Sequence, residues 1–417
     1  PLRAPLPPAA RGGTPRRRAL PVRWARRGTS ATPRAPPQLP EHLQRIVDDY
    51  DRQRAEEASA SQLLPSVLRT RFGGILGMGI AGSVAYVFYC FDDVASELHT
   101  INGWLLARLE PSTAAALLVR LGAWGLLPCD YDKEDPYLVA EPLDGLRLVT
   151  PLGLGAGVDT LAMSPNAFLG LGFGFVEAGP VTVAAEADVE TLCVRLAARD
   201  RTGPLTHLGK VGVTIAGSRE ELVQLTARLG PNVDYLSVQP EPLACASEAA
   251  LQSLVSGVMA AAAAIPGGVR VFVRLPVPAK AAAASASALV AAARRAGADG
   301  VVLCASEESG LKGLVSALSG AYSEADGKIV LLASGGGISS GKDMLSCIEA
   351  GASAVQIDSL LLRTGPQVCR RLKNELSMLL CNEGYVDLQS AVGAAHRRRS
   401  GAAARRNPWR RGAPAVR

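Results

Sequence analysis

The chain of 417 residues is long enough to bury a large core, and 48% of its residues are hydrophobic. Its net charge of +6 comes from its ends, because residues 1–40 carry nine arginines, residues 397–417 carry eight, and neither segment contains an acid. The other 27 basic residues face 38 acids, which leaves the central part at −11. This balance argues against nucleic-acid binding by the folded body.

The N-terminal segment, residues 1–40, is rich in Arg, Pro and Ala and lacks acids. This composition is typical of a mitochondrial or plastid transit segment, and the alternative is a disordered basic tail without a targeting role. Residues 41–71 have the composition of a polar helix. At the other end, we expect residues 397–417 to form a basic, disordered tail.

An uncharged stretch of twenty residues, 72–91, follows the polar helix. At about 1.5 Å per residue, a helix of this length spans a hydrocarbon layer of about 30 Å. The stretch therefore predicts a single transmembrane helix, and the alternative is a buried core helix. Arg69 and Arg71 precede it and Asp92 and Asp93 follow it. Positive residues favour the inner side, so we expect the globular body on the intermembrane-space side of the mitochondrial inner membrane.

Residues 92–128 have the pattern of two amphipathic helices separated at Glu110–Pro111. From 129 to 396, short apolar or β-branched runs alternate with helical segments, which predicts an α/β fold of the (β/α)₈ or TIM-barrel type. The runs that we expect to form strands span 146–156, 174–179, 210–216, 233–238, 269–275, 300–306, 329–335 and 354–359.

The eight cysteines and four histidines are scattered along the chain without a CxxC pair or another ligand spacing. Most of the cysteines lie in apolar runs and have the pattern of small core residues. We therefore expect neither a metal site nor a disulfide framework.

Three segments carry a family resemblance. Residues 150–159 read TPLGLGAGVD, residues 172–177 read GFGFVE, and residues 350–356 read AGASAVQ. With the preceding helical pair, they resemble the class 2 dihydroorotate dehydrogenases, which are quinone-dependent, mitochondrial enzymes of pyrimidine biosynthesis. The resemblance covers about residues 72–396. It implies a TIM barrel, an FMN cofactor, and proton and hydride removal from dihydroorotate.

The general base of that family is a serine in the loop after the fourth barrel strand. Here a gapless match places Pro242 at this position, and a shifted match places Pro240 or Glu241 there, after Gln239. Proline has no proton acceptor in its side chain, so the match predicts a lost base. Glu241 and Cys245 remain as possible substitutes.

The family also reads its substrate with asparagines from several loops. At the matching positions this chain has Thr214, Gln239 and Ala305. A buried polar ligand that loses such partners loses roughly 1–3 kcal/mol for each. The sequence therefore predicts poor binding of dihydroorotate.

The resemblance also assigns a set of candidate FMN contacts, most of which are small residues. They are Ala156, Gly157, Arg274, Gly313, Gly336, Gly337 and Ser359. Asp358, however, precedes Ser359 where a phosphate is expected, and its carboxylate repels an anion. We therefore expect no bound cofactor, with FMN as the open alternative.

A further candidate is Arg120, which matches an arginine that faces the quinone tunnel in the family. The alternative is an arginine at the surface or at a lipid headgroup. Taken together, these departures predict a catalytically inactive protein that acts as a structural or accessory subunit. Inner-membrane lipid and a respiratory or ATP synthase complex are the expected partners. The alternatives are an active FMN-dependent dihydroorotate:quinone oxidoreductase and a flavin- or nucleotide-binding sensor.

Overall fold

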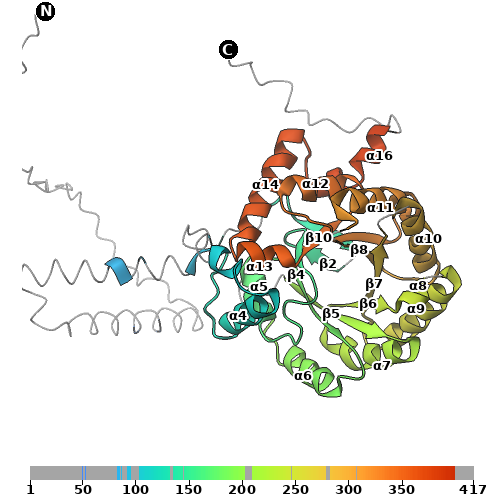
Figure 1. The fold of residues 1–417 in the computed structure, drawn as a ribbon, viewed down its shortest axis with the longest axis horizontal. Coiled ribbons are helices and arrows are strands. Elements are labelled where there is room, and N and C mark those ends of the chain that lie inside the picture. The colour runs from blue at the N-terminus through green and yellow to red at the C-terminus, as the bar shows by residue number, and fades with distance from the viewer. Residues whose placement is uncertain are drawn as a thin grey trace, which may run out of the picture. The chain divides into compact units, whose positions relative to one another are not determined.

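A computed structural model describes residues 103–131, 135–143, 145–201, 209–245, 247–278, 282–306 and 308–399, together with Asp49, Arg52, 82–84, Tyr86 and 92–94 (Figure 1). The chain divides into two units, Pro1–Gly77 and Met78–Arg417. Apart from 82–84 and Tyr86, the predicted membrane span lies outside the described residues. Among the described residues, no helix combines the length and the apolar character that crossing a bilayer requires.

Eight parallel strands form a closed barrel in the second unit, in the order β10-β3-β4-β5-β6-β7-β8-β9. The closed barrel confirms the predicted (β/α)₈ fold, and each of the later apolar runs overlaps one of its strands. The barrel strands are β3 (Leu152–Leu154), β4 (Phe175–Val181), β5 (Lys210–Gly217), β6 (Tyr235–Pro240), β7 (Arg270–Val277), β8 (Gly300–Ala305), β9 (Val330–Gly335) and β10 (Ala354–Ile357).

Helices surround the barrel and connect its strands (Figure 1). They are α4 (Pro111–Ala123), α5 (Pro165–Gly170), α6 (Glu186–Ala197), α7 (Arg219–Leu229), α8 (Pro242–Cys245), α9 (Glu248–Ala263), α10 (Ala282–Arg295), α11 (Gly310–Ala325), α12 (Gly341–Glu349), α13 (Ser359–Thr364), α14 (Val368–Glu383), α15 (Leu388–Ala391) and α16 (Ala394–Arg399). Their starts follow local signals in the sequence. At the start of α7, for example, the N–H of Ser218 donates to Glu221 Oε2 at 2.7 Å, as in a capping box.

The first predicted strand, 146–156, is not one strand. Its beginning forms β2 (Leu146–Leu148), which pairs antiparallel with β1 (Ala140–Leu143) in a separate two-stranded sheet. Its end forms β3 of the barrel. The chain bends between them at Thr150–Pro151, where proline offers no N–H for a continuous ladder.

Large aromatic side chains fill one level of the barrel interior. The ring of Tyr235 lies edge-on to those of Phe175 and Phe272, with centroids 6.3 and 5.4 Å away. Neighbouring strands leave room for these rings by carrying glycine, and an added Cβ would lie 2.2–2.4 Å from a ring atom. These glycines are Gly153, Gly212 and Gly300. This pairing of large and small residues produces the close packing of a barrel core.

The helical segment before the barrel docks through α4 and through a helical turn at 103–106. The break between them precedes Pro111, as predicted. An added Cβ on Gly103 would lie 2.2 Å from the carbonyl oxygen of Thr364, so the two backbones touch. Buried Asp130 accepts a bond from Lys373 Nζ on α14 at 2.8 Å and lies 3.7 Å from Arg370. This ionic cluster links α14 to the segment that enters the barrel.

Candidate functional site

Polar side chains from four strands meet inside the barrel in a buried cluster around Glu177. Glu177 on β4 is fully buried, and its Oε2 accepts bonds from Arg274 Nη1 on β7 at 2.7 Å and from Thr214 Oγ1 on β5 at 3.0 Å. Its Oε1 accepts from Gln356 Nε2 on β10 at 2.7 Å. Three donors thus satisfy the buried carboxylate, which would otherwise be strongly destabilising.

The predicted cofactor contact Arg274 is therefore bound to protein groups. Its Nη1 also lies 3.2 Å from Gln356 Oε1, and its Nη2 lies 3.5 Å from Ser334 Oγ. Burial works against its charge, but Cys304 and Glu177 raise the pKa of the guanidinium above its ordinary value. A charged arginine in this position serves first to neutralise Glu177.

Sequence reasoning did not include Glu177 and Gln356 among the site residues. Both lie within otherwise apolar strands, in the runs FVEAGPV and AVQI. A charged or amide side chain in such a run is buried only when it is paired. That rule indicates a polar cluster, although it does not identify Arg274 as the partner, because 97 residues separate Arg274 from Glu177.

The loop after β6 contains the expected base position. Gln239 and Glu241 are exposed, and Pro242 begins the short helix α8. Neither Pro242 nor the following Leu243 carries a proton acceptor. Burial raises the pKa of the Cys245 thiol, which makes it a poor acceptor at neutral pH. Of the two possible substitutes, Glu241 is the one that keeps an accessible acceptor.

The three positions that match the substrate asparagines do not form a set of amide donors. Thr214 is fully buried and gives its hydroxyl to Glu177. Gln239 is exposed near the end of β6, and Ala305 ends β8 with no polar side-chain atom. The described residues therefore offer one free side-chain amide, that of Gln239, at these positions.

The glycines expected at the cofactor lie at the carboxyl ends of β3 and β9, as such a site requires. Gly157, Gly336 and Gly337 have φ of +111°, +68° and +74°, which side chains rarely adopt. An added Cβ on Gly157 or Gly337 would meet no atom of the described residues within 4 Å, so the described part of the chain leaves open space beside these backbones. Ala156 and Gly313, which lies in the first turn of α11, are half-buried. Small residues thus keep this part of the mouth accessible.

The part of the candidate site where the FMN phosphate is expected is less suitable for the cofactor than the glycines are. The N–H of Ser359, a candidate phosphate donor at the start of α13, donates to Asp358 Oδ1 at 2.5 Å. The carboxylate thus takes a donor that a phosphate would need and adds a negative charge beside it. The glycines fit FMN, but the phosphate end does not.

Two further expectations concern Arg120 and metals. Arg120 is exposed on α4, whereas Leu118 and Val119 are buried on the same helix. Within the described part of the chain, no group of three or more His, Cys, Asp or Glu side chains could hold a metal ion. The seven cysteines that the structure describes are free thiols.

Comparisons with known proteins agree on one family. The family model "Dihydroorotate dehydrogenase" matches residues 314–380. The chain is 29% identical over 358 residues to dihydroorotate dehydrogenase (quinone) of Rhodospirillum rubrum. This alignment covers 73% of this chain and 96% of the relative. It is also 29% identical over 382 residues to the mitochondrial dihydroorotate dehydrogenase (quinone) of Mus musculus, covering 76% and 96%.

Among solved structures, the fold is similar to DHODH of Eimeria tenella in complex with ferulenol. The TM-score is 0.62 at 24% identity, and the match covers 69% of this chain and 96% of that one. This likeness supports the barrel architecture. The family model and the two enzymes above lead to the conclusion that this chain is similar to the dihydroorotate dehydrogenases, and to their quinone-dependent, class 2 members in particular.

Proposed function

We propose that this chain is a dihydroorotate dehydrogenase-like protein that no longer catalyses the reaction. The observation that carries the proposal is the loop after β6, where a gapless match to the family places Pro242 at the position of the general base. Without an acceptor held over the substrate, the proton cannot be removed as the hydride leaves. A barrel that has lost this proton acceptor can still serve as a structural element.

The state of the cofactor site supports the same proposal. Arg274 is occupied by Glu177, and Asp358 takes the N–H of Ser359. Similarity to this family nevertheless makes FMN the cofactor to test first, and the open glycine edge at Gly157 and Gly337 leaves room for it. Bound flavin without turnover would correspond to a sensor rather than an enzyme.

We further propose that the protein works at the mitochondrial inner membrane as an accessory subunit of a respiratory or ATP synthase complex. Its described helical segment before the barrel exposes large apolar side chains, which is the behaviour of a membrane- or protein-facing surface. They are Trp104, Leu105, Leu109, Leu117, Trp124 and Leu126. The mitochondrial mouse relative agrees with this location.

The competing proposal is an active FMN-dependent dihydroorotate:quinone oxidoreductase with a relocated base. The observation that favours it is the exposed carboxylate of Glu241, which lies one residue before Pro242. A carboxylate is able to take a proton, provided that it reaches the substrate.

An absorption spectrum of the purified full chain distinguishes these proposals. We expect no flavin bands, or flavin bands that dihydroorotate does not bleach under anaerobic conditions without an added quinone. Bleaching that is abolished by Glu241→Gln would refute the inactive reading and identify the base. The matched control is Glu220→Gln, which removes an acid from α7. Stoichiometric co-purification with a membrane complex would support the accessory role, and a monodisperse, uncomplexed protein in a native membrane extract would contradict it.

A further inference from the structure

A surface cavity of about 370 Å³ lies where the helical turn at 103–106 meets the connection between α13 and α14. Gly103 and Trp104 form one wall, and Arg363, Thr364 and Arg371 line the other. The contact between the backbones of Gly103 and Thr364 closes its base. This cavity is separate from the barrel mouth, and neither the family's chemistry nor the proposed accessory role uses it.

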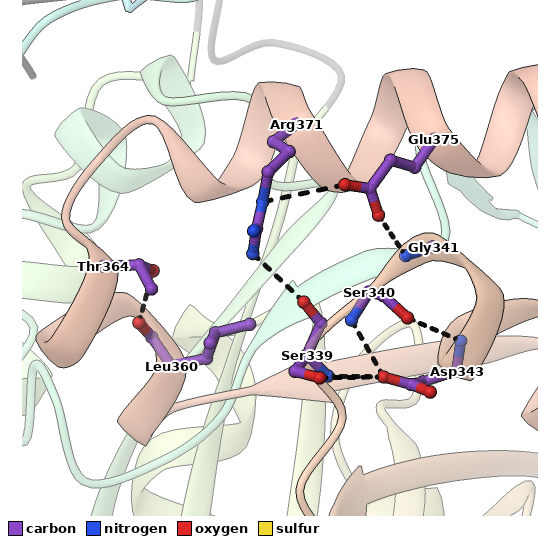
Figure 2. A network of polar contacts seen from close by, with 8 residues as sticks. All are labelled: Ser339, Ser340, Gly341, Asp343, Leu360, Thr364, Arg371 and Glu375. Carbon is purple, nitrogen blue, oxygen red and sulfur yellow. Dashed lines mark hydrogen bonds and ion pairs between the residues drawn. The ribbon is translucent and has the colours of Figure 1, made fainter. Parts of the chain in front are cut away.

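The cavity is lined by two guanidinium groups. Arg363, at the end of α13, is exposed and has no hydrogen-bond or ion-pair partner among the described residues. Arg371 on α14 is held in place, because its Nη2 donates to the carbonyl oxygen of Ser339 at 3.0 Å and its Nε lies 3.8 Å from Glu375 Oε1. Figure 2 shows Arg371 extended from α14 toward Ser339, with Thr364 and Leu360 of α13 to its left.

Among the described residues, the acid that contacts Arg371 is Glu375, and this carboxylate also binds a second element. Glu375 Oε2 accepts the N–H of Gly341 at 2.7 Å, at the start of α12 (Figure 2). Asp343, also drawn there, is occupied by Ser339 and Ser340. Among the described residues that line or contact the cavity, two guanidiniums are therefore accompanied by the one carboxylate of Glu375, which Arg371 shares with Gly341. Such a concave, cationic site favours an anion.

The rim of the cavity is apolar, which narrows the class of anion. Trp104 is 56% exposed, and the exposed Leu105 and Leu109 follow it on the same segment. The guanidinium of Arg108 lies 3.3 Å from the centre of the Trp104 ring, which places another cation at the rim. Tryptophan beside arginine is typical of the headgroup level of a membrane.

We propose that this cavity binds the phosphate group of an anionic glycerophospholipid, with the acyl chains running over Trp104 and the neighbouring leucines. Arg363 forms the principal contact, because it has no other partner among the described residues, and Arg371 forms the positioned second contact. This inference rests on the proposed location at a membrane and not on the proposed loss of catalysis. The proposed lipid contact lies outside the predicted membrane span at 72–91.

The test uses the full chain in a neutral detergent, titrated with dihexanoyl phosphatidylglycerol below its micellar concentration and followed by calorimetry. Dihexanoyl phosphatidylcholine and inorganic phosphate are the comparison ligands. We expect the phosphatidylglycerol to bind more tightly than either. Arg363→Gln should weaken its binding about fivefold, since a basic residue near an anionic membrane surface contributes roughly 1 kcal/mol.

Two further variants separate charge from structure. Arg363→Lys should restore part of the affinity, and Lys312→Gln, which removes an exposed cation from α11, should leave it unchanged. The inference is overturned if Arg363→Gln has no effect, if Lys312→Gln has the same effect, or if inorganic phosphate binds as tightly as the lipid. None of these results depends on whether flavin is bound, so failure here is distinguishable from failure of the proposed function.

Discussion

The buried pair of Glu177 and Arg274 gives the sharpest prediction, because one partner cannot reach solvent. Glu177 has no exposed side-chain surface, whereas 13% of the Arg274 side chain is exposed. Arg274→Met keeps a side chain of similar length but leaves the carboxylate with Thr214 and Gln356 as neutral donors. Breaking a buried pair in this way costs about 3–5 kcal/mol of unfolding free energy.

For a barrel of this size, that loss corresponds to a melting temperature roughly 6–20 °C lower, measured by circular dichroism on the full chain.

Two controls sharpen the comparison. Arg270→Met changes an arginine on the same strand whose ion pair with Asp299 is at the surface, and it should cost about 0–1 kcal/mol. The double variant Glu177→Gln/Arg274→Met removes both charges and should recover much of the loss. An effect of Arg274→Met as small as that of Arg270→Met would refute the account of a buried carboxylate held by this guanidinium.

Four other predictions follow from particular contacts. Asp358→Asn should raise the affinity for FMN about tenfold in a fluorescence titration, because it removes the charge beside the Ser359 N–H, and an unchanged affinity would exclude Asp358 as the obstacle. Asp130→Ala should leave Lys373 uncompensated and cost about 3 kcal/mol, seen as faster proteolysis near residue 130, while equal cleavage of both proteins would contradict the cluster. Gly153→Ala should cost about 1–3 kcal/mol in melting experiments, because its Cβ would lie 2.2 Å from the Phe175 ring, and Gly82→Ala, with open space, should not. Among the described cysteines, exposed Cys381 should react first with a thiol reagent at pH 8, whereas Cys347, whose pKa burial raises to about 12, should stay unmodified until the protein unfolds.

Much of the architecture could be predicted from the amino-acid sequence. The alternation of apolar runs and helices predicts the barrel, and the runs overlap the strands that the structure describes. These features depend on local periodicity and on glycine and proline positions, which a single chain displays directly. The error at 146–156 arose because two adjacent apolar runs look continuous until Thr150–Pro151 bends the chain into two different sheets.

The expected loss of the base at Pro242 is a prediction that the sequence alone can make, because it depends on the chemistry of one side chain. The contacts inside the barrel could not be predicted in this way. Glu177, Arg274 and Gln356 come from strands far apart along the chain, and closure of the barrel brings them within hydrogen-bond distance. The cavity beside Arg363 likewise depends on a contact between Gly103 and Thr364.

The sequence by itself determined which residue types stand at the carboxyl ends of the strands. The tertiary structure decided which of those groups are already bound to one another. Arg274 is read from the sequence as a cation for a cofactor, but inside the closed barrel it lies 2.7 Å from a buried carboxylate. The physical reason is that burial makes an unpaired charge far more costly than a paired one, and pairing depends on distances that only the folded chain fixes.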